Sequence, residues 1–173
     1  MIKLINGRGQ LGEKLNILLK DEFYEKDIYL YHTWNPWQKD HNTQEREYKK
    51  FVGFVEQHKN NKIILISTYS QNENHYVHFK QVAEAYLITQ CSDCLVIRLP
   101  NLIGNKGILK RLKNQTASPQ GKIEFMTIED AAMEIINLIK YNGLLKVISL
   151  KGEEISARLV NEILQKGAKI EDA

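Results

Sequence analysis

Residues 63–80, IILISTYSQNENHYVHFK, decide the fold class predicted for this chain. The stretch begins with four consecutive apolar residues, which is typical of a short strand buried on both faces. Two hydroxyl residues, Ser67 and Thr68, follow this strand, and a polar loop then leads to a helix that carries Tyr76 and Lys80. Residues four apart share one face of a helix, so the phenol and the amine are predicted to point into one site. We expect that site at the carboxyl ends of the strands, where open α/β sheets bind ligands.

A hydroxyl, a tyrosine and a lysine in this arrangement can move a proton to or from a substrate hydroxyl or carbonyl. The pKa of free tyrosine is about 10, which is too high for a base at neutral pH. A nearby ammonium favours the phenolate, and a drop of ~3 units in the pKa would correspond to ~4 kcal/mol of differential stabilisation. The Tyr-x-x-x-Lys spacing also occurs by chance in helices, so this stretch alone does not assign a catalyst.

Composition excludes several classes of protein. The length of 173 residues fits one domain, and 43% apolar and 26% charged residues are ordinary for a globular chain. No apolar run approaches the ~18 residues that cross a bilayer, and the N-terminus lacks a signal-peptide core, so we expect a cytoplasmic protein without a membrane partner. A net charge of +3, with no basic stripe between aromatic residues, argues against a nucleic-acid partner.

The two cysteines, Cys91 and Cys94, follow a predicted helix and precede a predicted strand. A redox pair would be expected at a helix N-terminus, where the thiolate is stabilised. No second pair is present to complete a zinc site. We therefore expect two reduced thiols and no metal.

A glycine-rich turn joins the first predicted strand, residues 2–5, to a helix with leucines at 11, 15, 18 and 19. The turn reads NGRGQLG over residues 6–12. A strand, Gly-x-Gly-x-x-Gly and a helix form the context in which a pyrophosphate approaches the backbone at a helix N-terminus.

The second predicted strand, DIYLYH, runs from Asp27 to His32. A nicotinamide-dinucleotide site would place an acidic residue for the ribose at the end of this strand, and none is present there. Trp34 and Trp37 follow in a loop, where they either wall a ligand pocket or cover apolar surface.

The next helix is predicted from about Thr43, with Asn42 as N-cap and Glu45 completing a capping box. Its inward residues are expected to be Tyr48, Phe51, Val52 and Val55. A further strand at residues 95–99 precedes Pro100 and Asn101. Strands that alternate with helices indicate a parallel sheet.

The order of these motifs resembles the extended short-chain dehydrogenase/reductases, which include NAD-dependent epimerases and dehydratases of nucleotide sugars. The segment 125–131 resembles the place where a strand of this family runs into a helix after the substrate region. Residues 147–150 and a helix from about Ser156 look like the family's C-terminal strand and helix. The motifs that carry the resemblance are Gly7-x-Gly9-x-x-Gly12, Asp27-x-x-x-x-His32, Ser67-Thr68, Tyr76-x-x-x-Lys80, Arg98-Leu99-Pro100-Asn101 and Gly104.

The resemblance implies an α/β fold with a reduced Rossmann-like parallel sheet of about five strands flanked by helices. Residues 1–173 would form one domain, with 105–125 as a vestigial substrate-region insert. The strand DIYLYH matches the family's fourth strand, so the two strands that carry the adenosine end of the cofactor would be missing and residues 2–5 would lie at the sheet edge. Lys3 would guard this edge, whereas pairing of the edge, or of a helix pair, with a second copy would give a homodimer.

For the site, the resemblance implies an oxidoreductase or epimerase in which Tyr76 is the general acid/base and Lys80 its activator and nicotinamide-ribose ligand. Thr68 or Ser67 would hydrogen-bond the substrate oxygen. The cofactor would be NAD or NADP, bound weakly or not at all if the adenosine half-site is missing. The residues expected around it are Gly7, Arg8, Gly9, Gln10, Leu11, Gly12, His32, Lys80, Pro100 and Asn101.

The implied substrate is a nucleotide sugar or similar small molecule of glycan or surface-polysaccharide biosynthesis. The alternative is a non-catalytic Rossmann-like binding or regulatory protein that has lost dinucleotide turnover. Four basic residues in the insert would either contact a nucleotide diphosphate or form a solvated helix face: Lys106, Lys110, Arg111 and Lys113.

Overall fold

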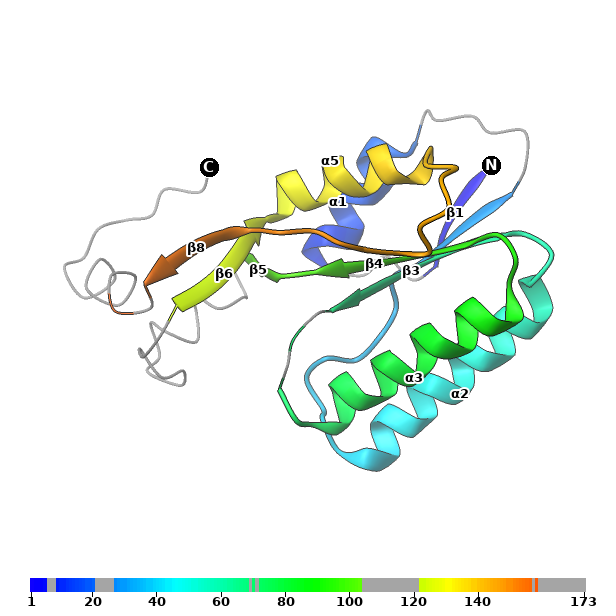
Figure 1. Ribbon diagram of the computed structural model, residues 1–173, viewed down its shortest axis with the longest axis horizontal. Helices are drawn as coiled ribbons and strands as arrows, with labels where there is room; N and C mark the ends of the chain where they lie inside the picture. Colours follow the sequence, from blue (N-terminus) through cyan, green and yellow to red (C-terminus); the bar gives the residue numbers. More distant parts are fainter. Residues whose placement is uncertain are drawn as a thin grey trace.

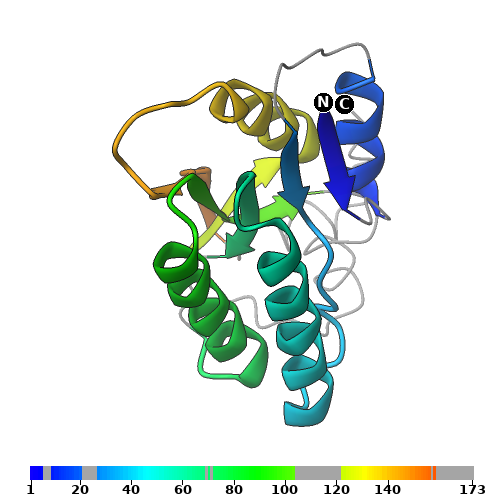
Figure 2. The ribbon, with the colours of Figure 1, turned by 90° about the vertical axis from the view of Figure 1, so that its right-hand side faces the viewer.

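The computed structural model describes residues 1–5, 9–20, 27–68, 70, 72–103, 122–156 and 158. These residues form three layers, with a parallel sheet between two pairs of helices (Figure 1). Helices α1 (Gln10–Leu18) and α5 (Ile128–Ile139) cover one face of the sheet. Helices α2 (His41–His58) and α3 (His75–Gln90) cover the other face, as Figure 2 shows from the side.

The central sheet has the strand order β1-β2-β3-β4-β7, and all neighbouring strands run parallel. Its strands are β1 (Ile2–Ile5), β2 (Ile28–Tyr31), β3 (Lys62–Thr68), β4 (Cys94–Leu99) and β7 (Val147–Ser149). Within the part of the chain that the structure describes, β1 pairs with β2 alone and lies at the edge. The predicted α/β fold, with a sheet of about five parallel strands and the first strand at the edge, is confirmed.

A second, three-stranded sheet extends beyond the end of the central one (Figure 1). It consists of β5 (Asn101–Ile103), β6 (Lys122–Thr127) and β8 (Glu153–Ser156), with β8 antiparallel to β6. The sequence did not predict this sheet. Ser156 itself still pairs with Lys122 in β8, and Arg158 is helical; the rest of the helix expected from about Ser156 lies outside the described residues.

The central strands send alternate side chains into two hydrophobic clusters. In β3, Ile64 and Ile66 face α1 and α5, whereas Ile63 and Leu65 face α2 and α3. A sheet covered on both faces needs continuous apolar strands, which explains the run that opens residues 63–80. The predicted strand-to-helix junction is also present, since β6 runs into α5 at Ile128.

Helix α2 differs from its prediction at the N-terminus. It begins at His41, and the N-cap is Asp40 rather than Asn42, because the Asp40 side chain accepts a hydrogen bond from the Thr43 amide at 2.9 Å. A carboxylate at this position also complements the helix dipole. Phe51 and Val55 are fully buried as predicted.

The cysteines Cys91 and Cys94 are free and buried. Burial raises the pKa of the Cys91 thiol to about 11 and raises the pKa of Cys94, so both thiols are protonated at neutral pH. No helix among the described residues is long and apolar enough to cross a membrane. In the same residues, no three His, Cys, Asp or Glu side chains gather closely enough to hold a metal ion.

Candidate functional site

The carboxyl ends of the parallel strands bring several predicted site residues to one edge of the sheet. Gly9 comes shortly after β1, His32 directly after β2, and Thr68 ends β3. Helix α3, which starts just beyond β3, adds Tyr76 and Lys80. The predicted residues Gly7, Arg8 and Gly104, together with the insert 105–121 and its basic residues, lie outside the described residues.

Gly9 opens helix α1 in a conformation that L side chains avoid. Its φ is +124°, and it is the N-cap of α1 without a side-chain cap from any described residue. An added Cβ would meet no atom within 4 Å, so the backbone angle rather than crowding selects glycine here. The first-turn amides of a helix without a side-chain cap can bind an anion, and here they lie at the carboxyl edge of the sheet.

Among the other residues predicted along this turn, Leu11 and Gly12 are buried in the helix. Leu11 belongs to the hydrophobic cluster beneath α1 and α5. These two residues therefore position the turn, and any contact with an anion would use their backbone.

Lys80 is buried beneath the site, with 3% of its surface exposed. Its ammonium donates a hydrogen bond to the Ile66 carbonyl at 2.7 Å and lies 4.4 Å from the ring centroid of Trp34. Burial lowers the pKa of Lys80 to about 7, although the carboxylates of Glu84 and Glu47 act to raise it. The amine is therefore close to half-protonated at neutral pH.

Tyr76 is half-buried in the first turn of α3. Burial raises the pKa of its phenol to about 12. The expected lowering of this pKa by Lys80 is wrong for the structure as it stands. The physical reason is the burial of the phenol itself, while the amine of Lys80 contacts a backbone carbonyl and an indole instead.

The two hydroxyls at the end of β3 have different surroundings. Thr68 is half-buried, and its hydroxyl accepts a hydrogen bond from the Ser70 amide at 3.2 Å. Ser67 is buried and donates to the Glu84 carboxylate at 2.5 Å. Glu84 also accepts from Nε and Nη2 of Arg98, at 3.0 and 2.5 Å. Thr68 is thus the hydroxyl nearer the open edge, and Ser67 belongs to a buried ion-pair network.

His32 is a neutral imidazole at physiological pH. Burial, with a further contribution from the charge of Lys80, lowers its pKa to about 4. A neutral imidazole offers one donor and one acceptor, which suits a hydroxyl-bearing ligand such as a ribose.

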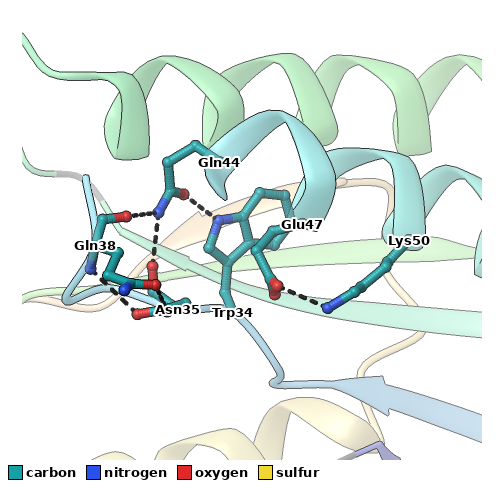
Figure 3. Close-up of polar contacts among 6 residues, drawn as sticks. All are labelled: Trp34, Asn35, Gln38, Gln44, Glu47 and Lys50. Carbon is teal, nitrogen blue, oxygen red and sulfur yellow. Dashed lines mark hydrogen bonds and ion pairs between the residues drawn. The ribbon is translucent and has the colours of Figure 1, made fainter. Parts of the chain in front are cut away.

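The two tryptophans of the loop after β2 separate in the structure. Trp37 is 73% exposed, whereas Trp34 packs against Phe51 and covers Lys80. Figure 3 shows that the indole of Trp34 also donates to the side chain of Gln44, at 2.7 Å. Trp34 therefore covers internal surface beside the candidate site, and Trp37 faces solvent.

Pro100 and Asn101 follow β4 directly. Asn101 is exposed and donates from its side chain to the Glu124 carbonyl at 3.1 Å, which ties β5 to β6. The described contacts of Asn101 are therefore structural ones between strands of the second sheet.

Sequence reasoning missed three buried polar residues around the site, Gln44, Glu47 and Glu84. Glu84 follows Lys80 by one helical turn and shares its face, so helical spacing alone signals its position. Gln44 and Glu47 share the inward face of α2 with Phe51. Helical spacing alone does not signal their burial, because Gln and Glu are ordinarily exposed.

No protein-family model matches the sequence, and no curated protein sequence matches it. Solved structures do match, over nearly the whole chain. The UDP-glucose 4-epimerase of Thermotoga maritima, solved with UDP-glucose, matches with a TM-score of 0.75 and 13% identity over 99% of this chain and 84% of the epimerase.

This chain has the fold of the nucleotide-sugar epimerases and reductases. The dTDP-4-dehydrorhamnose reductase of Clostridium acetobutylicum matches with a TM-score of 0.74 and 13% identity, over 99% of this chain and 81% of the reductase. The Bordetella bronchiseptica enzyme WbmG, solved with NAD and UDP, matches with a TM-score of 0.72 and 12% identity over 96% of this chain and 77% of the enzyme. These likenesses establish the fold.

Proposed function

We propose that this chain binds an NAD or NADP dinucleotide and a nucleotide sugar, or a similar small molecule, at the carboxyl edge of the central sheet. The observation that carries the proposal is Gly9, whose φ of +124° opens α1 at the same edge as Thr68 and Tyr76. Structures with this fold contain NAD together with UDP, or UDP-glucose, which supports the ligand classes.

The proposed reaction is an oxidoreduction or epimerisation of the sugar. The dinucleotide, when bound, supplies or accepts a hydride at carbon. Tyr76 would donate or accept the matching proton at the substrate oxygen, and Thr68 would hydrogen-bond that oxygen. His32 would offer its neutral imidazole to a ribose hydroxyl. The phenol of Tyr76 could act as a base only if the Lys80 ammonium moved close to it, because the positive charge would then lower the pKa of the phenol from about 12.

A second candidate function is binding without turnover. It is favoured by the contacts of Lys80, whose amine is held by Ile66 and Trp34, and by the raised pKa of Tyr76. It is also favoured by the edge position of β1, which has no described strand on its outer side to carry an adenosine. In this case the protein would serve as a binding or regulatory partner of a sugar-modifying enzyme.

Binding is tested by titration calorimetry with the oxidised and reduced forms of NAD and NADP. Gly9→Ala should weaken binding at least about tenfold, because a Cβ at this φ costs ~1–2 kcal/mol and shifts the turn. Gly53→Ala is the matched control, since Gly53 is exposed on α2 with open space around its Cβ position. Absence of binding at millimolar concentrations of all four forms would overturn the proposal.

Turnover is tested with a panel of UDP and dTDP sugars by following the absorbance of the reduced dinucleotide and the epimer composition. Tyr76→Phe should lower turnover by about 10²-fold or more and leave dinucleotide affinity unchanged. Tyr48→Phe, on α2, is the control. Dinucleotide binding by the wild-type protein without turnover of any sugar in the panel would favour the binding function, and turnover that survives Tyr76→Phe would remove Tyr76 from its role.

A further inference from the structure

The loop between β2 and α2 is fastened to α2 by one buried side chain, Gln44. Gln44 is fully buried and uses both ends of its amide (Figure 3). Its nitrogen donates to the carbonyls of Asn35 and Gln38 at 2.7 and 2.5 Å, and its oxygen accepts from the Trp34 indole at 2.7 Å. A buried amide with all of these bonds made holds its partners in one arrangement.

The loop is also braced from within. The Asn35 carboxamide oxygen accepts from the amides of Trp37 and Gln38 at 3.0 and 3.2 Å, and Asp40 caps the start of α2. Trp34 therefore lies in a hydrogen-bonded loop, and its own hydrogen bond to Gln44 holds the indole ring in place.

The face that Trp34 presents is occupied by the ammonium of Lys80, at 4.4 Å from the ring centroid. On another side the same ammonium is bound to the Ile66 carbonyl. The charged and titratable groups that act on it are His32 after β2, Glu47 on α2 and Glu84 on α3. With 3% of Lys80 exposed, no ligand reaches this amine while the indole is in place.

We propose that Trp34 is a plug over Lys80, latched by Gln44, and that a ligand contacting this amine must first displace the indole. In the unliganded protein, the indole therefore blocks the position where the proposed dinucleotide would place its nicotinamide ribose. The identity of the ligand rests on the proposed function, whereas the shielding of Lys80 does not.

The plug explains why the phenol of Tyr76 lacks help from a lysine only one turn away. While the indole and the Ile66 carbonyl hold the ammonium, no described contact joins it to the phenol of Tyr76. Displacing Trp34 would expose the amine at the carboxyl edge of the sheet and make it available to a ligand or to the phenol.

The ligand-free test is a pH titration of the lysine side chains by NMR, with ¹³C-labelled lysine. The Lys80 signal is the one that disappears in Lys80→Met. Trp34→Ala should let water solvate the ammonium and raise the Lys80 pKa by at least about one unit. Trp37→Ala, which removes an exposed tryptophan three residues away, should leave that pKa unchanged. An equal Lys80 pKa in wild type, Trp34→Ala and Trp37→Ala would overturn the plug.

The ligand test is the calorimetric affinity of NAD and NADP for the same proteins. Trp34→Ala should bind at least about tenfold more tightly than wild type, because the ligand no longer has to displace the indole. Trp37→Ala should bind as wild type does. Measurable binding with equal affinities in wild type, Trp34→Ala and Trp37→Ala would overturn the plug.

The two tests separate the two proposals. A raised Lys80 pKa in Trp34→Ala with no binding by any variant would remove the proposed function and support the shielding. If Trp34→Ala does not fold, Gln44→Met serves instead, since it keeps the side-chain volume and removes the latch. The same changes in pKa and affinity are then expected, and their absence overturns the proposal.

Discussion

Lys80 links the stability of this protein to pH at the scale of a single residue. The pKa of its amine is about 7 in the folded protein, below its ordinary value of 10.5, because burial disfavours the charge. Between these two values the unfolded chain binds a proton that the folded chain does not, so stability rises with pH across this window.

We expect the free energy of unfolding to rise by ~2 kcal/mol between pH 7 and pH 9. Urea denaturation at the two pH values measures this change. The comparison stops at pH 9 because the Cys91 thiol, with its pKa raised to about 11, favours unfolding above its ordinary pKa of 9.0. Lys80→Met should lack the rise, and a rise of the same size in this variant would show that another group causes it.

Glu84 gives a second prediction for a single residue. Its carboxylate is buried and accepts from the Ser67 hydroxyl and from the Arg98 guanidinium, so it fixes the ends of β3 and β4 to α3. Glu84→Gln should lower the free energy of unfolding by ~2–3 kcal/mol. The amide NH₂ of the glutamine would face the donors of Ser67 and Arg98, and the charge of Arg98 would lose its carboxylate partner.

The matched control is Glu45→Gln on α2. Glu45 pairs with Lys49 at the surface, at 2.8 Å, and solvent screens such exposed pairs so that they contribute little to stability. Urea unfolding curves of the two variants give the comparison. A loss in Glu84→Gln no greater than that in Glu45→Gln would mean that the buried network does not stabilise the fold.

At the scale of elements, Gly152 joins the two sheets. It precedes β8, and its amide donates to the Glu124 side chain of β6 at 2.8 Å. A Cβ at Gly152 would lie 1.9 Å from the Phe125 carbonyl oxygen, which is a backbone atom that cannot turn aside. The connection from β7 to β8 therefore passes against β6 at a distance that only glycine permits.

Gly152→Ala should destabilise the protein by ~2–4 kcal/mol, with the loss concentrated in β6 and β8. Thermal unfolding measures the total, and amide hydrogen exchange shows where protection is lost. Gly53→Ala, on an exposed face of α2, should instead stabilise by up to ~1 kcal/mol. Unchanged protection of the β6 and β8 amides in Gly152→Ala would contradict the close approach.

The elements that could be predicted are those whose own residues show a hydrophobic pattern typical of a strand or a helix. The apolar run in β3, the leucine spacing of α1 and the strand at residues 2–5 all specify local structure, and the structure contains each of them. Continuous apolar strands also require helices on both faces, which gave the layered architecture.

The second sheet and the loop at Trp34 could not be predicted in this way. β8 reads Glu-Glu-Ile-Ser, with no apolar pattern, and its strand forms because β6 offers it backbone partners. The position of Trp34 depends on Gln44, a residue whose burial follows from the carbonyls that surround it in space. Such contacts arise from the folded backbone and leave no periodic trace in a single sequence.

At the scale of the whole molecule, β1 is the edge strand of the central sheet among the described residues, and an edge strand can pair with a second copy. Lys3 is the one charged residue of β1, and its ammonium lies 2.6 Å from Asp27 and 3.5 Å from the Tyr29 hydroxyl. A charged side chain on an edge strand discourages pairing with another sheet.

Lys3→Val should therefore increase self-association with rising protein concentration. Size-exclusion chromatography with light scattering measures the molar mass across that range. Lys49→Val, on the exposed side of α2, adds a valine away from the edge and is the control. Equal masses for the two variants would mean that Lys3 does not guard the edge.

The two hydrophobic clusters also differ in when they can form during synthesis. The cluster beneath α2 and α3 draws all of its buried members from residues 29–96, so it can form once β4 has left the ribosome. The opposite cluster needs α5, whose buried residues end at Ile139. In a nascent chain that stalls before α5, the apolar faces of β3 and β4 that α5 would cover remain exposed to solvent. A chaperone would therefore find the largest apolar surface between the synthesis of β4 and that of α5.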